Sequence, residues 1–343
     1  MTPRPPLQLS LFFFAASPED APGDVYRLLV ESTRFADRHG FAAVWTPERH
    51  FQEFGGPYPN PSLTSAALAT ITSQIRLRAG SVVAPLQSAL RIAEEWAVVD
   101  NLSHGRVGVS FASGWHADDF VLAPAIYRDR RRDMIEKLET VKKLWRGEKI
   151  TLSNGEGREI QVGILPRPIQ PELDIWLTCQ EDANFATTGE LGYKVLTNLN
   201  GKRLADLDRK CRLYHDGHER AHGRRGHFTL MAHTFVGTDD DHVWKVAGRA
   251  LARYLELRVD MDAKLHEDLE LSAADREFLA RRGTAQFLGE TSLIGTPETC
   301  AARARRFYDA GVDEIACLID FGVPFDEAMA SLERLATIKA QLA

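Results

Sequence analysis

Three consecutive residues with reactive side chains follow an apolar run near the start of the chain. Glu48, Arg49 and His50 come directly after FAAVWTP (41–47), a pattern typical of a β-strand that stops at a proline. If that strand belongs to a parallel barrel, the loop lies where barrel enzymes hold their chemistry. The arginine would then stabilise a developing anion and the histidine would transfer a proton. Hydrogen bonds that merely order the loop are an equally good interpretation of these residues alone.

A second reactive group is rich in histidine. His218-Glu219-Arg220-Ala221-His222 matches HExxH, in which two histidines one helical turn apart bind zinc. The surrounding HDGHERAHGRRGH is charged and contains glycine, and it falls in a helix-to-strand connection, the non-catalytic end of a barrel. We therefore predict a solvated helix face and no metal site. The chain also has no GxGxxG after a strand, no GxxxxGK(S/T) and no GxSxG, so dinucleotide-fold, P-loop and α/β-hydrolase interpretations fail.

Small residues end two neighbouring expected strands. RLRAGSVVA (76–84) and RVGVSFA (106–112) are short apolar runs, and the stretch between them has a helical stripe. Such a strand–helix–strand unit places two parallel strands side by side. Gly80-Ser81 and Ser113-Gly114 then lie at the strand ends where α/β proteins bind ligands. Tight turns would need the same residue types, so the pattern alone favours neither role.

The elements that must position these residues alternate between strand and helix. Eight strands are expected, at 7–15, 41–47, 76–84, 106–112, 174–178, 194–198, 227–235 and 314–320. Alternation over this length predicts an α/β fold, a TIM (β/α)8 barrel in one domain over 1–343. Asn154-Gly155 predicts a hairpin over 149–164 that leaves the barrel. The polar span 258–293 is expected to be a long irregular insertion.

Composition excludes several classes of protein. The 343 residues carry a net charge of −6 and no basic bias, which argues against nucleic acid as a partner. No apolar run reaches membrane-spanning length, and LSLFFFAA is too short and strand-like for a signal peptide. The four cysteines are far apart and form no CxxC. We expect a reduced, cytoplasmic protein that has no contact with a membrane.

Three long stretches resemble the luciferase-like flavin monooxygenases: FAAVWTPERHFQEFGGPYPNP, DNLSHGRVGVSFASGWHADDF and GVDEIACLIDFGV. The subgroup they resemble acts with polyketide and nonribosomal peptide assembly lines, as in the mupirocin pathway, and the similarity covers nearly the whole chain. The resemblance implies a TIM barrel that binds FMN, as FMNH2, at the strand carboxyl ends and uses molecular oxygen. It also implies a separate flavin reductase and a homodimer formed through parts of 61–73 and 88–102.

The resemblance assigns individual residues. Arg49 aligns with the family's active-site histidine and His50 with the neighbouring histidine, so both are candidate catalytic residues. A cis peptide is expected between Gly80 and Ser81. The remaining cofactor-binding candidates follow the fourth, fifth and sixth expected strands: Ser113, Gly114, Trp115, Thr178, Gln180, Asn184 and Thr197.

One loop departs from the family's pattern. In the family the flavin phosphate lies near the loop that here runs from Thr178 to Asn184, at a helix N-terminus, which attracts phosphate. Relatives usually have neutral small residues there, whereas this chain has Glu181 and Asp182. Two carboxylates repel a phosphate dianion, so the sequence predicts weakened FMN binding.

The resulting functional prediction is an FMN-dependent, two-component monooxygenase. It would oxidise an organic substrate, either a small molecule or a carrier-protein-bound intermediate of natural product biosynthesis. A deazaflavin-dependent oxidoreductase of the same superfamily is the enzymatic alternative. The alternative of another class is a non-catalytic flavin-binding or scaffold protein, which Glu181 and Asp182 motivate.

Overall fold

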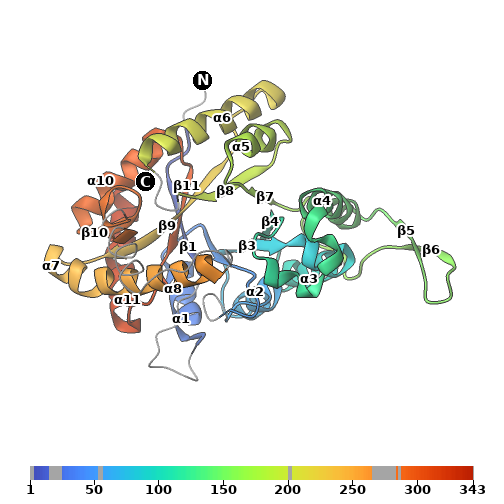
Figure 1. Ribbon diagram of the computed structural model, residues 1–343, viewed down its shortest axis with the longest axis horizontal. Helices are drawn as coiled ribbons and strands as arrows, with labels where there is room; N and C mark the ends of the chain where they lie inside the picture. The colour runs from blue at the N-terminus through green and yellow to red at the C-terminus, as the bar shows by residue number, and fades with distance from the viewer. Residues whose placement is uncertain are drawn as a thin grey trace.

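Eight parallel strands close into a barrel in the computed structural model (Figure 1), which describes residues 4–14, 25–52, 57–199, 203–264, 283–284 and 287–342. The barrel strands are β1 (Gln8–Phe12), β2 (Ala43–Thr46), β3 (Arg76–Val83), β4 (Val107–Ala112), β7 (Ile175–Thr178), β8 (Lys194–Asn198), β9 (Phe228–Val236) and β11 (Glu314–Leu318). Each pairs in parallel with its neighbours, and β1 closes the ring against β11. The TIM barrel and all eight strands predicted from the sequence are confirmed.

The strands are apolar on both faces because each face is covered. Leu9 and Leu11 pack outward in the large core between strands and helices, whereas Phe12 belongs to a separate cluster inside the barrel. In β11, Ile315 lies in the outer core and Ala316 in the inner one. This alternation has the period of two that a strand imposes, and burial on both sides explains the nearly continuous apolar runs in the sequence.

Helices surround the barrel and follow the strands in order (Figure 1). Their bounds are α1 (Arg27–Arg38), α2 (Pro61–Ala69), α3 (Ala89–Leu102), α4 (Arg130–Arg146), α5 (Asp182–Glu190), α6 (Leu204–His222), α7 (Asp240–Val243), α8 (Arg249–Lys264), α10 (Pro297–Ala310) and α11 (Phe325–Leu342). Their ends follow local rules. At the start of α10 the Thr296 side chain accepts from the Thr299 N–H, with a proline next, and α4 ends at Gly147 in the left-handed region.

The segment from 149 to 164 leaves the barrel as predicted. β5 (Ile150–Ser153) pairs with antiparallel β6 (Glu159–Val162), and the hairpin projects away from the barrel (Figure 1). The Asn154 side chain accepts from the backbone N–H groups of Glu156 and Arg158, which orders the turn.

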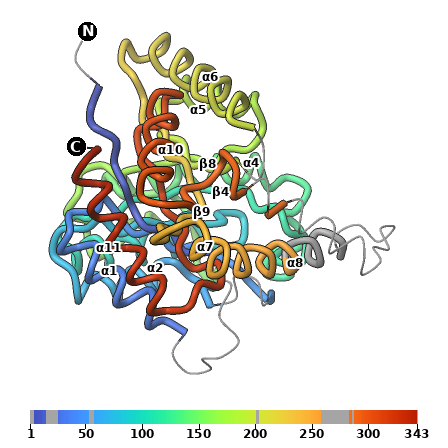
Figure 2. The backbone as a smooth tube through the Cα atoms, turned by 90° about the vertical axis from the view of Figure 1, so that its left-hand side faces the viewer, coloured from blue at the N-terminus to red at the C-terminus, as the bar shows by residue number. Residues whose placement is uncertain are grey.

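The insertion expected at 258–293 is partly regular. Helix α8 continues to Lys264, after α7 and a π-helical turn over Trp244–Gly248, as one nearly continuous helical run (Figure 2). At the other end lies β10 (Leu293–Gly295), a strand that the sequence did not predict. It pairs with the second half of β9. Most of the segment between them lies outside the described residues.

A buried ion pair fills the amino-terminal half of the barrel interior. Arg78 Nη1 lies 2.9 Å and 2.8 Å from the two carboxylate oxygens of Glu314, and the guanidinium carbon lies 4.9 Å from the ring centre of Trp45 and 4.4 Å from that of Trp176. Ser10 Oγ also donates to this carboxylate. Burial alone would raise the pKa of Glu314, but the Arg78 charge and a hydrogen bond from His227 hold that pKa well below its usual range.

This ion pair predicts a large effect of Glu314→Ala. Removal of the carboxylate leaves the Arg78 charge buried without its partner, so the free energy of unfolding in urea should fall by about 3–5 kcal/mol. The matched control is Glu172→Ala, which removes an exposed glutamate that lies 2.8 Å from Arg146. That loss should stay within about 1 kcal/mol. Equal small losses in both variants would contradict the prediction.

Candidate active site

A cavity of about 340 Å³ opens at the carboxyl ends of the barrel strands. Its walls are largely apolar and aromatic, with Phe12, Phe14 and Met231 among them. Polar groups enter from the ends of β7 and β8, at Thr178 and Asn198. This is the end of the barrel where the fold places its chemistry, and an apolar cavity with a few polar groups is the usual form of a cofactor or substrate site.

The backbone at Gly80 and Ser81 forms one wall of the cavity. The peptide between them is cis, as predicted. A Cβ on Gly80 would lie 2.6 Å from Phe12 Cε2 and 3.2 Å from Trp45 Cε3, so only glycine fits there. The Ser81 hydroxyl is hydrogen-bonded to that of Thr178, whose Oγ1 also lies 2.9 Å from Ser110 Oγ. A chain of hydroxyl groups therefore links the ends of β3, β4 and β7.

Arg49 is a buried cation in this cavity, with only 3% of its surface exposed. Its backbone N–H donates to the carbonyl of Tyr58 at 2.8 Å, and its guanidinium carbon lies 5.2 Å from the ring centres of Phe14 and of Trp115. Burial lowers the pKa of Arg49, and the charge of Asp119 opposes that shift. An arginine keeps its proton under such conditions, so the cavity contains a positive charge.

Asp119 lies in the same cavity, on the short 3₁₀ helix Ala117–Leu122 after β4. The side chain is 4% exposed. Burial raises the pKa of its carboxyl group, and the positive charge of Arg49 opposes that shift. The loops after β2 and β4 thus bring two ionisable groups of opposite charge into one apolar cavity.

Glu48 also lines the cavity, whereas His50 does not, and the Glu48 carboxylate is bound to the protein itself. The Glu48 carboxylate accepts from the Val83 N–H at 2.6 Å and from Gln87 Nε2 at 2.7 Å, which ties the loop after β2 to the end of β3. His50 Nε2 lies 3.2 Å from Glu48 Oε1, and the histidine is not among the residues that line the cavity. Glu48 therefore orders the loop that carries Arg49, and His50 contacts Glu48 instead of the cavity.

Comparison with known proteins identifies the family. Residues 7–314 match the family described as luciferase-like monooxygenase.

The chain belongs to the luciferase-like monooxygenase family.

The similarity to known relatives extends over nearly the whole length of this luciferase-like monooxygenase. The oxygenase component of a flavin-dependent trigonelline monooxygenase from Acinetobacter baylyi is 26% identical, over 96% of this chain and 93% of the relative. Two solved structures share the fold. Monooxygenase RslO1 from Streptomyces bottropensis has a TM-score of 0.80 at 22% identity, over 96% of this chain and 98% of its own. The oxygenating constituent of 3,6-diketocamphane monooxygenase from Pseudomonas putida, in complex with FMN, has a TM-score of 0.78 at 18% identity, over 98% of both chains.

Most of the predicted site residues of this luciferase-like monooxygenase meet at the cavity. Those that line it are Arg49, Gly80, Ser81, Gly114, Trp115, Thr178, Gln180 and Thr197. His50, Ser113 and Asn184 are not among the lining residues. Asn184 is exposed on α5, where its N–H donates to the carbonyl of Glu181. Gly114 has a positive φ of 76°, and a Cβ there would lie 2.8 Å from Phe120 Cε2.

Sequence reasoning missed several lining residues, among them Asp119, Asn198 and Tyr254. Asp119 stood inside the motif WHADDF, and its position after a barrel strand was a usable signal. Tyr254 comes from α8, beyond any strand end, and it is buried. No local pattern indicates that this helix reaches the cavity.

The HExxH motif lies on α6, and the prediction of a solvated helix face is wrong for His215 and His218, which are buried. The two histidines of the motif bond to the backbone. His218 Nδ1 lies 2.8 Å from the carbonyl oxygen of Arg224, and His222 Nε2 lies 3.0 Å from that of Glu190. Within the described residues, no three or more His, Cys, Asp and Glu side chains are grouped so as to hold a metal ion. In the same part of the chain, no helix is both long and apolar enough to cross a membrane.

The contacts of Glu48 predict a loss of order in the loop that carries Arg49. Glu48→Ala leaves the buried Val83 N–H without its acceptor, so the free energy of unfolding should fall by about 1–3 kcal/mol. Hydrogen exchange at the Val83 amide should become faster. Gln87→Ala is the matched control, because it removes a donor to Glu48 and leaves the Val83 contact intact. Unchanged exchange at Val83 in Glu48→Ala would count against this role.

Proposed function

We propose that this protein is the oxygenase of a two-component monooxygenase that uses reduced FMN and molecular oxygen to oxidise an organic substrate. The observation that carries the proposal is the largely apolar cavity at the carboxyl ends of the strands, with Gly80 and Ser81 in its wall, in a chain of this family. The relative named as the oxygenase component of a flavin-dependent monooxygenase supports the same assignment.

The residues around the cavity suit a flavin. Phe12, Leu196 and Met231 provide apolar contacts for a flat aromatic ring. Gln180 and Thr197 lie near the start of α5, and a helix N-terminus favours an anionic group such as the FMN phosphate. A reduced flavin bound there supplies the electrons that activate molecular oxygen.

The protein's own contribution is to shield and polarise this site. The aromatic walls exclude water, which strengthens electrostatic interactions inside the cavity. Arg49 supplies a fixed positive charge that stabilises negative charge developing on a reacting oxygen. Neither role requires His50, which contacts Glu48.

The partners in this proposal are a separate flavin reductase and a second copy of the chain. A relative named as an oxygenase component supports the reductase. Exposed apolar side chains on α2 and α3 support a homodimer through 61–73 and 88–102, since Leu63 is 67% and Leu102 45% exposed. The proposed substrate is a small molecule or a carrier-bound intermediate of natural product biosynthesis, and the proposed compartment is the cytoplasm.

Flavin titration under anaerobic conditions tests the proposal. We expect the purified protein to bind FMNH2, and the bound flavin to react with oxygen along a course different from that of free FMNH2 in stopped-flow absorbance. Binding of a reduced deazaflavin in place of FMNH2 would favour the deazaflavin-dependent alternative. Binding of FMN whose reaction with oxygen matches that of free flavin would indicate a flavin-binding protein without turnover.

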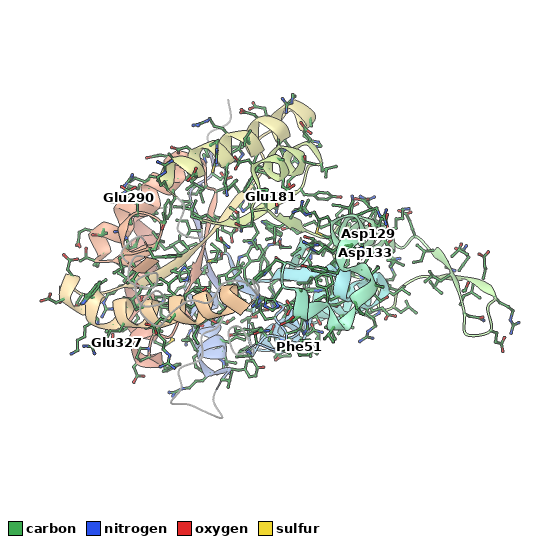
Figure 3. The ribbon with its side chains drawn as sticks, in the orientation of Figure 1. Phe51, Asp129, Asp133, Glu181, Glu290 and Glu327 are labelled. Carbon is green, nitrogen blue, oxygen red and sulfur yellow. The ribbon has the colours of Figure 1, made fainter. Side chains whose placement is uncertain are left out.

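The loop after β7 predicts only a small effect of its two carboxylates on FMN affinity. Glu181 (Figure 3) lies 2.8 Å from Arg131, and Asp182 lies 3.0 Å from Arg209, both on the exposed surface and outside the cavity lining. Because each charge has a cationic partner, the double variant Glu181→Gln, Asp182→Asn should change the Kd of FMN by less than about three-fold.

The repulsion expected from the sequence alone corresponds to a larger effect, a gain in FMN affinity of about five- to thirty-fold when both charges are removed. A gain of that size, shrinking as salt rises, would restore the earlier interpretation. Glu190→Gln is the matched control, because it removes an exposed glutamate paired with Arg220 at the other end of α5.

A further inference from the structure

The Asp119 carboxylate has an unusual feature for a buried charge. Its Oδ1 is buried and has no hydrogen-bond partner among the described residues, although the side chain lines the cavity. Buried polar atoms nearly always have a partner, and one left without it costs free energy. The neighbouring Asp118, in the same 3₁₀ helix, is exposed and pays no such cost.

A second unsatisfied acceptor lines the same cavity. Asn198 Oδ1, at the end of β8, is also buried without a hydrogen-bond partner in the described part of the chain. The two acceptors come from different sectors of the barrel, one after β4 and the other on β8. Two unsatisfied acceptors in one apolar cavity point to an occupant that carries N–H or O–H donors.

Burial raises the pKa of the Asp119 carboxyl group, and the positive charge of Arg49 opposes that shift. Arg49, His116 and His50 each act electrostatically on this carboxyl group, whereas Asp118 opposes them. An ionised acceptor makes stronger hydrogen bonds than a neutral one. The unsatisfied Oδ1 in the cavity wall is thus placed to accept a hydrogen bond from a ligand, in either protonation state of the carboxyl group.

We propose that Asp119 is a flavin-binding residue whose Oδ1 accepts a hydrogen bond from a ring N–H of the cofactor. This inference rests on the proposed function. The oxidised isoalloxazine ring has an N–H at N3, and reduction adds N–H donors at N1 and N5. An acceptor carboxylate in this cavity therefore suits the reduced cofactor, which offers it more donors.

Binding measurements on three variants test the inference. The Kd values of oxidised FMN and of dithionite-reduced FMN are measured anaerobically, and the Tm of each ligand-free protein is recorded. Asp119→Ala should weaken binding of reduced FMN about ten- to a hundred-fold. Asp119→Asn should weaken it less, because its amide oxygen still accepts. Asp118→Asn, the matched control, removes the same charge from the same turn and should leave both Kd values unchanged.

The thermal data separate a ligand-binding role from a structural one. Because Asp119→Asn removes both an unsatisfied buried charge and its attraction to Arg49, the Tm of the ligand-free protein should change little, and a ligand-binding role shows as a weaker Kd at a nearly unchanged Tm. A loss confined to reduced FMN assigns the donor to the N–H groups that reduction adds, and an equal loss in both states assigns it to N3–H. Unchanged Kd values, or a lower Tm with unchanged Kd values, would overturn the inference. Failure of the unaltered protein to bind either form would overturn the proposed function as well.

Discussion

The ion pair between Arg78 and Glu314 determines which end of the barrel interior is filled. Both groups are buried, and the guanidinium contacts the rings of Trp45 and Trp176, which also contact each other, so one arginine and two indole rings fill the amino-terminal half. The absence of a Cβ at Gly108 leaves room for the Trp176 ring, since a Cβ would lie 2.8 Å from its Cζ3. Because large side chains occupy that half, the space for a ligand remains at the carboxyl ends of the strands.

The change in side-chain size along single strands also leaves the space for a ligand at the carboxyl ends. β3 carries Arg78 into the interior and then Gly80 two residues later, while β7 carries Trp176 and then Thr178. In both strands a large inward side chain near the base is followed by a small one near the cavity. Alternation places these residues on the same face, so two short sequences specify both the base of the barrel and a wall of the site.

The sequence predicted the strands well because each is an apolar run bounded by turn residues. It also predicted the hairpin, since Asn154 orders the turn with its own side chain. Eight residues of the cavity lining could be predicted because they lie at or just after the ends of strands. The rest depends on contacts between distant segments. Tyr254 reaches the cavity from α8, and Glu181 pairs with Arg131 fifty positions earlier in the chain. The sequence shows that Glu181 is charged, but it does not show that its partner, Arg131, lies on α4.

Two buried carboxylates line the cavity, and they differ in whether the protein itself satisfies their oxygens. This difference indicates which of them stabilises the fold and which binds a ligand. Glu48 is satisfied by the N–H of Val83 and the amide of Gln87, so its burial stabilises the folded chain. Asp119, equally buried, has an oxygen that no described residue satisfies. The charge of Asp119 faces that of Arg49, but this pairing does not require that Oδ1 be buried without a hydrogen bond. The unsatisfied oxygen lowers the stability of the empty protein and gains a hydrogen bond when a ligand with donors binds. This difference in free energy between the empty and the occupied cavity makes the cavity selective for such a ligand.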